Sequence, residues 1–228
     1  MPEELSELIA ISPIDGRYQS KTKPLAQFFS EYALIKYRVL VEVEWLKSLS
    51  MADELKEIQK ISKGSIAELD ELAANFSIDD AAAVKTIEQT TNHDVKAVEY
   101  WLRDTLKTKK NLAPITSFIH FACTSEDINN LSYALMLKGA RDKIILPKLI
   151  SIISNLSDLA NKYAGIPMLS RTHGQPASPT TLGKELANVV FRLNRQKDSL
   201  AELALQGKIN GAVGNFNAHL SAYPTYDW

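Results

Sequence analysis

The sequence holds a single cysteine, Cys123, so it cannot form a disulfide within the chain. It also lacks any apolar run near the ~20 residues that a membrane-spanning helix requires. The first residues, Met1–Glu4, are acidic and are not followed by the apolar segment of a secretory signal peptide. We therefore expect a protein of the reducing cytoplasm that has no membrane partner.

Neither sign of charge is in excess. The 26 lysines and arginines nearly balance the 27 aspartates and glutamates, which gives a formal net charge of −1. Bulk electrostatics therefore give no reason to expect nucleic acid or an anionic membrane as a partner. A local cationic pocket for a phosphate or a carboxylate remains compatible with this balance.

Motifs for metals and nucleotide cofactors are missing as well. The four histidines lie far apart, and the sequence contains neither an HExxH nor a CxxC pattern. It has no P-loop and no GxGxxG fingerprint, since Gly207, Gly211 and Gly214 have the wrong spacing and context. The sequence thus predicts no metal site and implies no cofactor.

What is present is an ordinary globular composition with helical periodicity. Apolar residues make up 45% and charged residues 23% of the 228 positions, enough for a sizeable core in one large or two smaller domains. Period-two alternation over five or more residues is absent, apart from short pieces near 166–169 and 208–209. We therefore predict an all-α fold.

Several helix starts can be assigned in the first half of the chain. Apolar residues at spacings of three and four predict one long helix that begins at Pro24. Ser65–Glu68 matches a capping box, and Ser77 with the acidic residues after it should begin another helix. A break near Asn111–Pro114 predicts a boundary between an N-terminal helical domain, residues 1–112, and a long-helix domain, residues 113–228.

The second domain is predicted to contain two long antiparallel helices. The first begins near Thr124–Asp127, and we expect a kink or local break in it at Pro147. A loop with three prolines, residues 166–179, leads to the second helix, from Leu182 to Leu203. Both helices carry broad apolar stripes, so other subunits or further sequence must cover the face that remains.

Four polar clusters lie in predicted loops or helix starts, where helical proteins usually place their chemistry. In the first, Ser12–Tyr18, the guanidinium of Arg17 suits a bidentate clamp for a phosphate or carboxylate. Tyr18 adds a hydroxyl or a ring face. Taken alone, this cluster is more simply interpreted as a surface loop with an incidental arginine.

The second and third clusters precede predicted helices, whose first N–H groups bind anions. Asn92, His93 and Asp94 form the second, in which His93 offers a proton donor; the simpler interpretation is an N-cap made by Asn92 or Asp94. Thr124 and Ser125 lead the third and offer two hydroxyls to a carboxylate or phosphate. For this cluster, function and plain capping explain the residues equally well.

The fourth cluster, Ser170–Pro176, presents His173 beside the hydroxyl of Thr172 and the amide of Gln175. An imidazole has the ordinary pKa best suited to proton transfer near neutral pH, so His173 ranks first among the histidines. A hydrogen-bonded structural histidine is the alternative. His120 lies in an apolar stretch and is expected in the core or an interface, and the role of His219 is open.

In this order the clusters resemble the adenylosuccinate lyases of the fumarase/aspartase superfamily, over nearly the whole chain from Ser12 to Trp228. Five segments in register carry the resemblance: Ser12–Tyr18, Thr90–Tyr100, His120–Asn130, Ser170–Pro176 and Lys208–Asn215. The family eliminates fumarate from adenylosuccinate, giving AMP, and from a succinyl-carboxamide ribotide intermediate of purine synthesis. The resemblance implies a fumarase/aspartase-like all-α fold, a purine nucleotide substrate and no cofactor.

The resemblance also implies roles for single residues. His173 would be the general acid that protonates the departing nitrogen. The residues implied in substrate binding are Arg17 and Tyr18 near the phosphate, Asn92, His93 and Asp94 in the same pocket, Thr124 and Ser125 at the succinyl part, and Thr172 and Gln175 near the acid.

The family's general base is a serine on a mobile glycine- and serine-rich loop with a Met-Pro-His-Lys-like signature, which these residues do not contain. Relatives run to about twice this length, form homotetramers and build each site from several subunits. We therefore expect a partial chain with an incomplete helix bundle that is inactive alone. The alternatives are another lyase of the superfamily, such as argininosuccinate lyase, or a non-catalytic helical interaction module.

Overall fold

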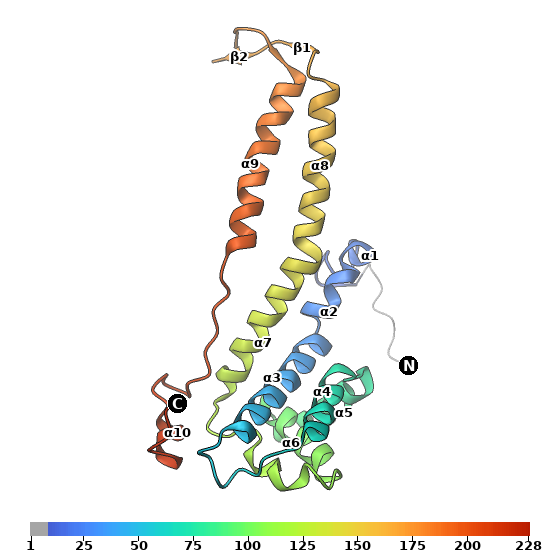
Figure 1. The fold of residues 1–228 in the computed structure, drawn as a ribbon. Helices are drawn as coiled ribbons and strands as arrows, with labels where there is room; N and C mark the ends of the chain where they lie inside the picture. Colours follow the sequence, from blue (N-terminus) through green and yellow to red (C-terminus); the bar gives the residue numbers. More distant parts are fainter. Residues whose placement is uncertain (1–8) are drawn as a thin grey trace. The chain divides into compact units, whose positions relative to one another are not determined.

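The computed structural model describes residues 9–228, which form two compact units (Figure 1). The first unit contains the chain up to Leu137 together with Gln206–Trp228, and the second contains Lys138–Leu205. Helices dominate both units, which confirms the predicted all-α class. The domain boundary predicted at residue 112 stays a prediction.

The first unit begins with short helical turns that lead into a long helix. These elements are α1 (Gln19–Thr22), a 3₁₀ turn (Lys23–Leu25), α2 (Ala26–Phe29) and α3 (Glu31–Met51). The prediction of one continuous helix from Pro24 is wrong, because the backbone is extended at Ser30. There the Ser30 hydroxyl accepts a hydrogen bond from the N–H of Ala33 and so caps α3.

Four more helices and a second 3₁₀ turn follow, and the last helix leads out of this unit. They are α4 (Lys63–Ala74), α5 (Ile78–Thr91), α6 (Asp94–Lys107), the 3₁₀ turn Ala113–Phe118 and α7 (Ser125–Ala140). The capping box proposed at Ser65–Glu68 is wrong, because α4 starts earlier and the hydroxyl of Ser62 caps it. The predicted start at Ser77 is confirmed, with a reciprocal capping box between Ser77 and Asp80.

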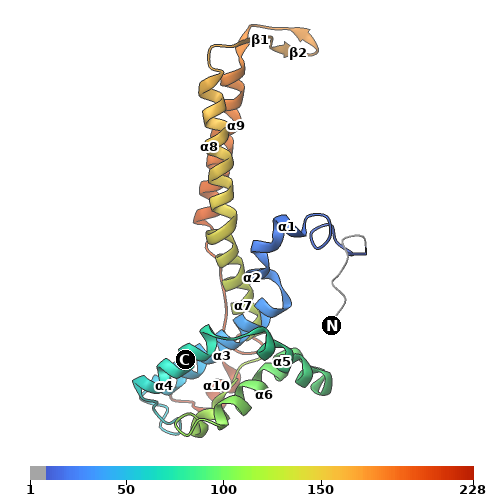
Figure 2. The same cartoon turned by 90° about the vertical axis from the view of Figure 1, so that its right-hand side faces the viewer.

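The main core of the first unit lies between α3, α4, α5 and α6, which gather around α3 in Figures 1 and 2. Its largest fully buried side chains include Leu46, Leu69, Leu102 and Leu106. Each such leucine stabilises the fold by about 1.5–3 kcal/mol relative to an exposed one. Helix α3 is thus held on several sides and forms a rigid base for the loops that contact it.

A second, aromatic cluster joins the last residues to the same unit. Trp45 of α3 and Phe121 pack with Tyr223 and Trp228, which flank and follow the short helix α10 (Asn217–Ala222). His219 lies within this cluster, fully buried, and neither ring nitrogen has a hydrogen-bond partner among the described residues. Its sequence context gave no role for it, and the structure places it in the core.

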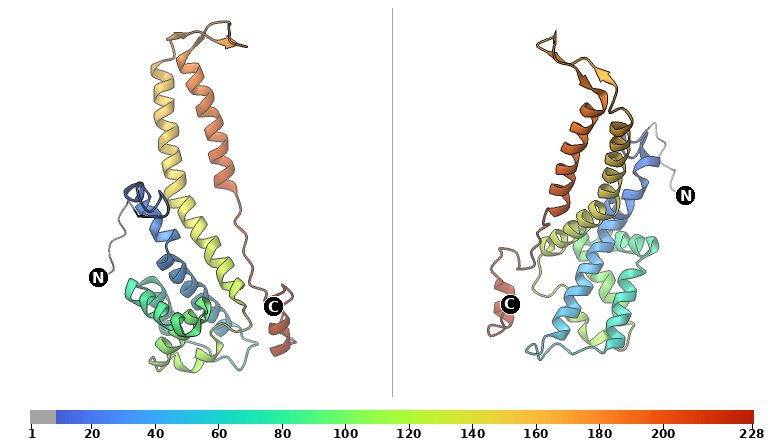
Figure 3. Two further views of the ribbon diagram at one scale, coloured as in Figure 1. Left: turned by 180° about the vertical axis from the view of Figure 1, so that it is seen from behind. Right: turned by 45° about the horizontal axis from the view of Figure 1, so that its top comes forward.

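The second unit is a helical hairpin with short strands between its helices (Figure 3). Its elements are a π-helical turn (Arg141–Ile145), α8 (Leu146–Lys162), β1 (Pro167–Met168), β2 (Arg171–Thr172), β3 (Gln175–Pro176), β4 (Thr180–Thr181) and α9 (Leu182–Glu202). The π turn ends two residues before Pro147, where the sequence predicts a kink or local break. Strand β1 pairs antiparallel with β4, and β2 pairs antiparallel with β3. The second strand piece predicted, near 208–209, forms no strand.

Helices α8 and α9 run antiparallel and approach closely at one end. Gly183 is buried there, and a Cβ added to it would lie 2.3 Å from the carbonyl oxygen of Ala160 and 2.6 Å from the Cα of Ala164. Large apolar side chains such as Ile150, Ile152 and Phe191 stay exposed within the unit. Among residues 9–228, no helix is both long and apolar enough to cross a membrane.

We predict that Gly183→Ala destabilises the protein, although alanine is the better helix former. The added methyl overlaps backbone atoms that cannot rotate away, and such overpacking costs about 1–3 kcal/mol. Urea unfolding followed by circular dichroism measures the loss, and amide exchange locates it in α8 and α9. Gly165→Ala is the matched control, because a Cβ there meets nothing within 4 Å. Equal stability of the two variants would contradict the close approach.

Candidate active site

The start of α6 is capped by a histidine. His93 has extended backbone angles, and its Nδ1 accepts a hydrogen bond from the N–H of Lys96 at 3.1 Å. The cap is therefore His93 itself, and the interpretation that Asn92 or Asp94 provides it is wrong; Asn92 instead ends α5 in a left-handed conformation. A backbone N–H only donates, so Nδ1 carries no proton and the neutral ring holds its proton on Nε2.

The free side of this ring points to the start of α7. The Nε2 of His93 lies 3.4 Å from the Oγ of Ser125, the first residue of that helix. The structure thus brings together two of the polar clusters that the sequence singles out, separated by 32 residues along the chain. Both side chains keep access to solvent. A proton donor and a hydroxyl therefore meet at two adjacent helix N-termini.

Asp94 is fixed by a side chain that sequence reasoning missed. The guanidinium of Arg38, almost fully buried on α3, donates to Asp94 Oδ2 at 2.6 Å and to Asn129 Oδ1 at 2.8 Å. Burial alone would raise the pKa of Asp94, but the N–H of Val95 and the charge of Arg38 outweigh it and lower the pKa. Asp94 is therefore an anion held in place beside His93.

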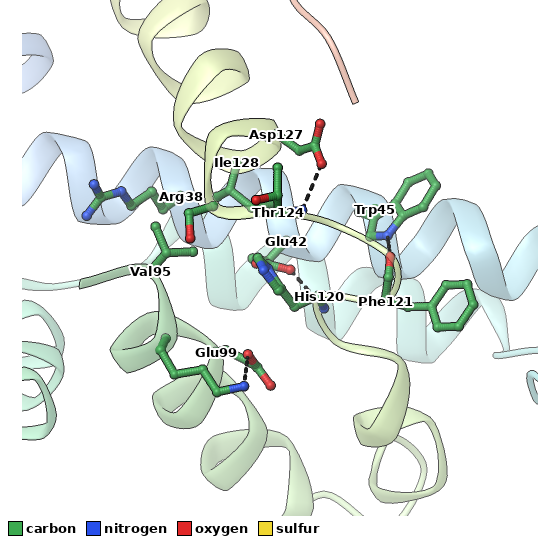
Figure 4. Close-up of polar contacts among 12 residues, drawn as sticks. Arg38, Glu42, Trp45, Val95, Glu99, His120, Phe121, Thr124, Asp127 and Ile128 are labelled. Atoms are coloured by element: carbon green, nitrogen blue, oxygen red, sulfur yellow. Dashed lines mark hydrogen bonds and ion pairs between the residues drawn. The ribbon is translucent and has the colours of Figure 1, made fainter. Parts of the chain in front are cut away.

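Thr124 belongs to a cap built on a fully buried carboxylate. Asp127 accepts the N–H of Thr124 at 2.8 Å through Oδ2 (Figure 4). Its Oδ1 accepts from Lys208 Nζ at 2.8 Å and from the N–H groups of Asn210 and Gly211 at 3.2 and 3.3 Å. The segment 208–211 is thereby tied to the first turn of α7.

The loop before Thr124 is held by a second buried carboxylate. Glu42 of α3 contacts His120 Nδ1 at 2.5 Å and accepts the His120 N–H at 3.1 Å. His120 and Ala122 both have positive φ, 61° and 58°, and between them the carbonyl of Phe121 accepts from Trp45 Nε1 at 2.9 Å (Figure 4). His120 was expected in the core or an interface; it is mostly buried, as the partner of the charged Glu42.

Arg17 and Tyr18 lie in the first unit and are exposed. The Arg17 guanidinium carbon lies 5.5 Å from the centre of the Tyr18 ring, which is a cation–π contact. Among the described residues no hydrogen bond or ion pair joins either side chain to His93 or Ser125. The two residues form a pair, and their predicted role at a phosphate stays a prediction.

Thr172, His173 and Gln175 lie in the second unit, on the hairpin of β2 and β3. Thr172 pairs with Gln175, and the two residues between them, His173 and Gly174, have φ of 49° and 77°. Positive φ at both central positions defines the tight turn that suits a two-residue hairpin. His173 is therefore presented at the exposed tip of a hairpin, and its two predicted neighbours flank it.

Other chemistries find little support in the part of the chain that the structure describes. No group of three or more His, Cys, Asp and Glu side chains suits a metal ion there. Burial raises the pKa of the Cys123 thiol far above its ordinary value, with Glu42 and Asp127 adding to the effect, so this thiol stays protonated. The donors that remain suit the binding of anions.

His120, which is mostly buried, and His219, which is fully buried, are predicted to make the stability depend on pH with opposite sign. Burial by itself would lower the pKa of His120, but Glu42 and then Glu99 outweigh it and raise the pKa. The stability that His120 adds is then fully present below about pH 6.5, the ordinary unfolded value, and is lost as pH rises through the folded pKa. Urea unfolding at a series of pH values measures the free energy of unfolding of wild type and of His120→Asn. The difference between the two should therefore shrink as pH rises.

His219 is the matched control. Burial lowers its pKa, so below about pH 6.5 the unfolded chain binds a proton that the folded chain refuses. Wild type should therefore lose stability relative to His219→Leu as pH falls. If the stability difference between wild type and His120→Asn instead grows as pH rises, this would contradict the pairing of His120 with Glu42.

Comparison with known proteins shows which family the chain resembles. A sequence model of the lyase family matches residues 16–228. The chain is 57% identical over 225 residues to a curated adenylosuccinate lyase of Haemophilus influenzae, 56% to one of Escherichia coli, and 50% over 224 residues to one of Legionella pneumophila. These matches cover 98–99% of the chain and 49% of each relative. The chain therefore spans about half the length of the curated relatives that it matches.

Solved structures agree on the fold. A 3-carboxy-cis,cis-muconate lactonizing enzyme from Pseudomonas putida superposes with a TM-score of 0.68 at 24% identity, covering 87% of this chain and 44% of that one. A fumarate lyase from Mesorhizobium sp. BNC1 gives 0.65 at 21% identity, with 86% and 44% covered. At such identities the likeness shows the fold alone. Since the family's sequence model covers all but the first residues, the chain belongs to the lyase family.

Proposed function

We propose that this chain is part of an adenylosuccinate lyase. The whole enzyme would eliminate fumarate from adenylosuccinate, giving AMP, and from the succinyl-carboxamide ribotide intermediate of purine synthesis. The observation that carries the proposal is the identity of 50–57% over nearly the whole chain to curated adenylosuccinate lyases of several bacteria. The adjacent helix starts with their polar groups supply a place for an anionic substrate.

The proposed reaction is a β-elimination that needs a base, an acid and a site for developing charge. The base removes a proton from the carbon next to a carboxylate, the electron pair forms the double bond of fumarate, and the C–N bond breaks. The departing nitrogen must be protonated, and we assign this step to His173. The base is assigned to the serine loop of the family, which the 228 residues do not contain.

His93, Thr124 and Ser125 are proposed to hold the succinyl part. The first-turn N–H groups of α7 and the positive end of its dipole favour a carboxylate there. The Nε2–H of His93, fixed by the Lys96 cap, faces the same place and adds a directed donor. These donors would stabilise the second negative charge that the carboxylate gains as the proton leaves.

Arg17 and Tyr18 are proposed to bind the nucleotide near its phosphate. The stacked guanidinium keeps its planar set of donors exposed, which suits a bidentate contact to phosphate. Asn92 and Asp94 are proposed to line the same pocket as His93, and Thr172 and Gln175 to flank His173. Asp94 would act while paired with Arg38, which limits it to accepting hydrogen bonds.

We further propose that the complete protein is a cytoplasmic homotetramer whose active sites combine several subunits. The support within the second unit is its exposed apolar side chains, among them Ile150, Ile152 and Phe191. Side chains of this size on a long helical hairpin are typical of surfaces that other helices cover. A tetramer would bury them.

The first test is the release of fumarate from adenylosuccinate. The 228-residue chain alone should release none, because the proposed base is missing. A chimera that continues after Trp228 with the second half of the Haemophilus influenzae relative should release fumarate. Argininosuccinate is the control substrate and should not be cleaved. Turnover by the 228-residue chain would place a base within it, and an inactive but folded chimera would contradict the proposed function.

The second test concerns His173 in the chimera. His173→Ala should lower kcat by about 10²–10⁴-fold, the usual contribution of a general acid, while KM changes much less. Met168→Ala, on β1 of the same unit, is the control and should keep full activity. Comparable losses in turnover and in substrate binding for His173→Ala would instead assign the imidazole to binding.

A further inference from the structure

Helix α3 carries three polar side chains on the face that it buries. Arg38, Glu42 and Trp45 are spaced by four and three residues and so share one side of the helix. Arg38 and Glu42 are 3% and 0% exposed, in the middle of a face that otherwise carries apolar core residues. Figure 4 shows Glu42 and Trp45 directed at His120 and Phe121 of the loop before α7.

Arg38 holds both sides of the contact between His93 and Ser125. One nitrogen donates to Asp94, the neighbour of His93, and another donates to Asn129. Asn129 lies one helical turn after Ser125, so it shares a face of α7 with it. A single rigid, planar guanidinium therefore sets the spacing between the two helix starts.

Glu42 and Trp45 hold the loop that leads into α7. Glu42 accepts the N–H of His120 and contacts its ring at Nδ1, and Trp45 donates through Nε1 to the carbonyl of Phe121. Two residues of this loop have positive φ, which side chains other than glycine adopt rarely. Such a backbone persists only where its surroundings fix it, and here α3 supplies the fixing contacts.

Stability alone does not account for the polar row of Arg38, Glu42 and Trp45 on α3. Charges buried in a helix face lose their hydration, and apolar side chains of similar volume often give an equally stable protein. The main core is already complete around α3 with Val39, Val43 and Leu46. Apolar side chains in these positions cannot fix the direction and distance of the polar groups at the start of α6 and in the loop before α7.

We propose that Arg38 and Glu42 are positioning residues, which from α3 fix the starts of α6 and α7 so that His93 Nε2 faces Ser125 Oγ. Neither touches the reacting atoms in this scheme. They act through Asp94 and Asn129 on one side and through His120 on the other. Their effect on turnover rests on the proposed function, whereas their effect on the His93 ring does not.

The first experiment measures the His93 ring in the 228-residue chain. Nitrogen-15 NMR of histidine-labelled protein, with the His93 signals assigned from His93→Gln, reports which ring nitrogen carries the proton. Wild type should show Nδ1 unprotonated. Arg38→Met should give a mixture of tautomers and faster exchange of the Lys96 amide, because the start of α6 loses its anchor. Asp94 is half exposed, so this variant leaves no buried anion unpaired.

Glu42→Gln is the second variant, and it keeps the shape and one acceptor while removing the charge. It should have the smaller effect on the His93 ring, and Glu42→Ala the larger. Val39→Ala is the matched control, because it removes packing from the same helix and no polar contact. Unfolding curves for all variants separate a loss of geometry from a loss of stability.

The second experiment measures steady-state kinetics of the same variants in the active chimera. Arg38→Met should lower kcat by about 10²-fold, the scale expected when reacting groups are displaced by about 1 Å, with a smaller change in KM. Val39→Ala should retain kcat. If wild-type chimera is inactive while the His93 ring still responds, positioning stands and the proposed function fails. If the His93 ring signals and the kcat of Arg38→Met and of Glu42→Ala match those of Val39→Ala, the proposal is overturned.

Discussion

The first N–H groups of a helix have no hydrogen-bond partner within it and need acceptors from elsewhere. The candidate site is built from the side chains that supply these acceptors at the starts of α6 and α7. His93 accepts from Lys96, and Asp127 accepts from Thr124. Each cap has a second function in the arrangement. The His93 ring is left with one tautomer and its donor directed at Ser125, and Asp127 fastens the segment after the second unit.

Buried charge is the means by which these caps are held in register. Arg38, Glu42 and Asp127 lie at 3% exposure or less, and every one of them has a partner on a different loop or helix. A paired charge that is buried resists movement, because separating it from its partner leaves an unpaired charge with little water. Burying these groups costs free energy, but it fixes the relative position of the α6 and α7 starts, which an apolar core does not define.

The sequence predicts well those features that depend on neighbouring residues. The helix start at Ser77, the start of α7 and the extent of α9 all follow from local patterns, and the structure confirms them. Local patterns failed where two signals competed, as at Ser62 and Ser65, where both serines stand near the helix start. His93 was missed as a cap because histidine is not among the usual capping residues.

The anchors of the site had no local signal at all. Arg38 meets Asp94 across 56 residues, and Glu42 meets His120 across 78. In the sequence both look like ordinary charged positions on the polar side of a long helix. Only the fold reveals that this side is buried, because α6 and the loop before α7 pack on it.

The pairing of Asp127 with Lys208 makes the first unit discontinuous along the chain. The second unit, Lys138–Leu205, begins in the last turn of α7 and is an insertion between the rest of α7 and the segment that returns to it. Closing a loop of this length costs conformational entropy that local helices do not have to overcome, although the cost grows slowly with length. During synthesis the main core can form once α3 to α6 and the 3₁₀ turn after them have emerged. The buried carboxylate of Asp127, by contrast, must wait for 81 further residues before its lysine arrives. This contact at the start of α7 therefore forms after the main core, so that the candidate site is completed late in folding.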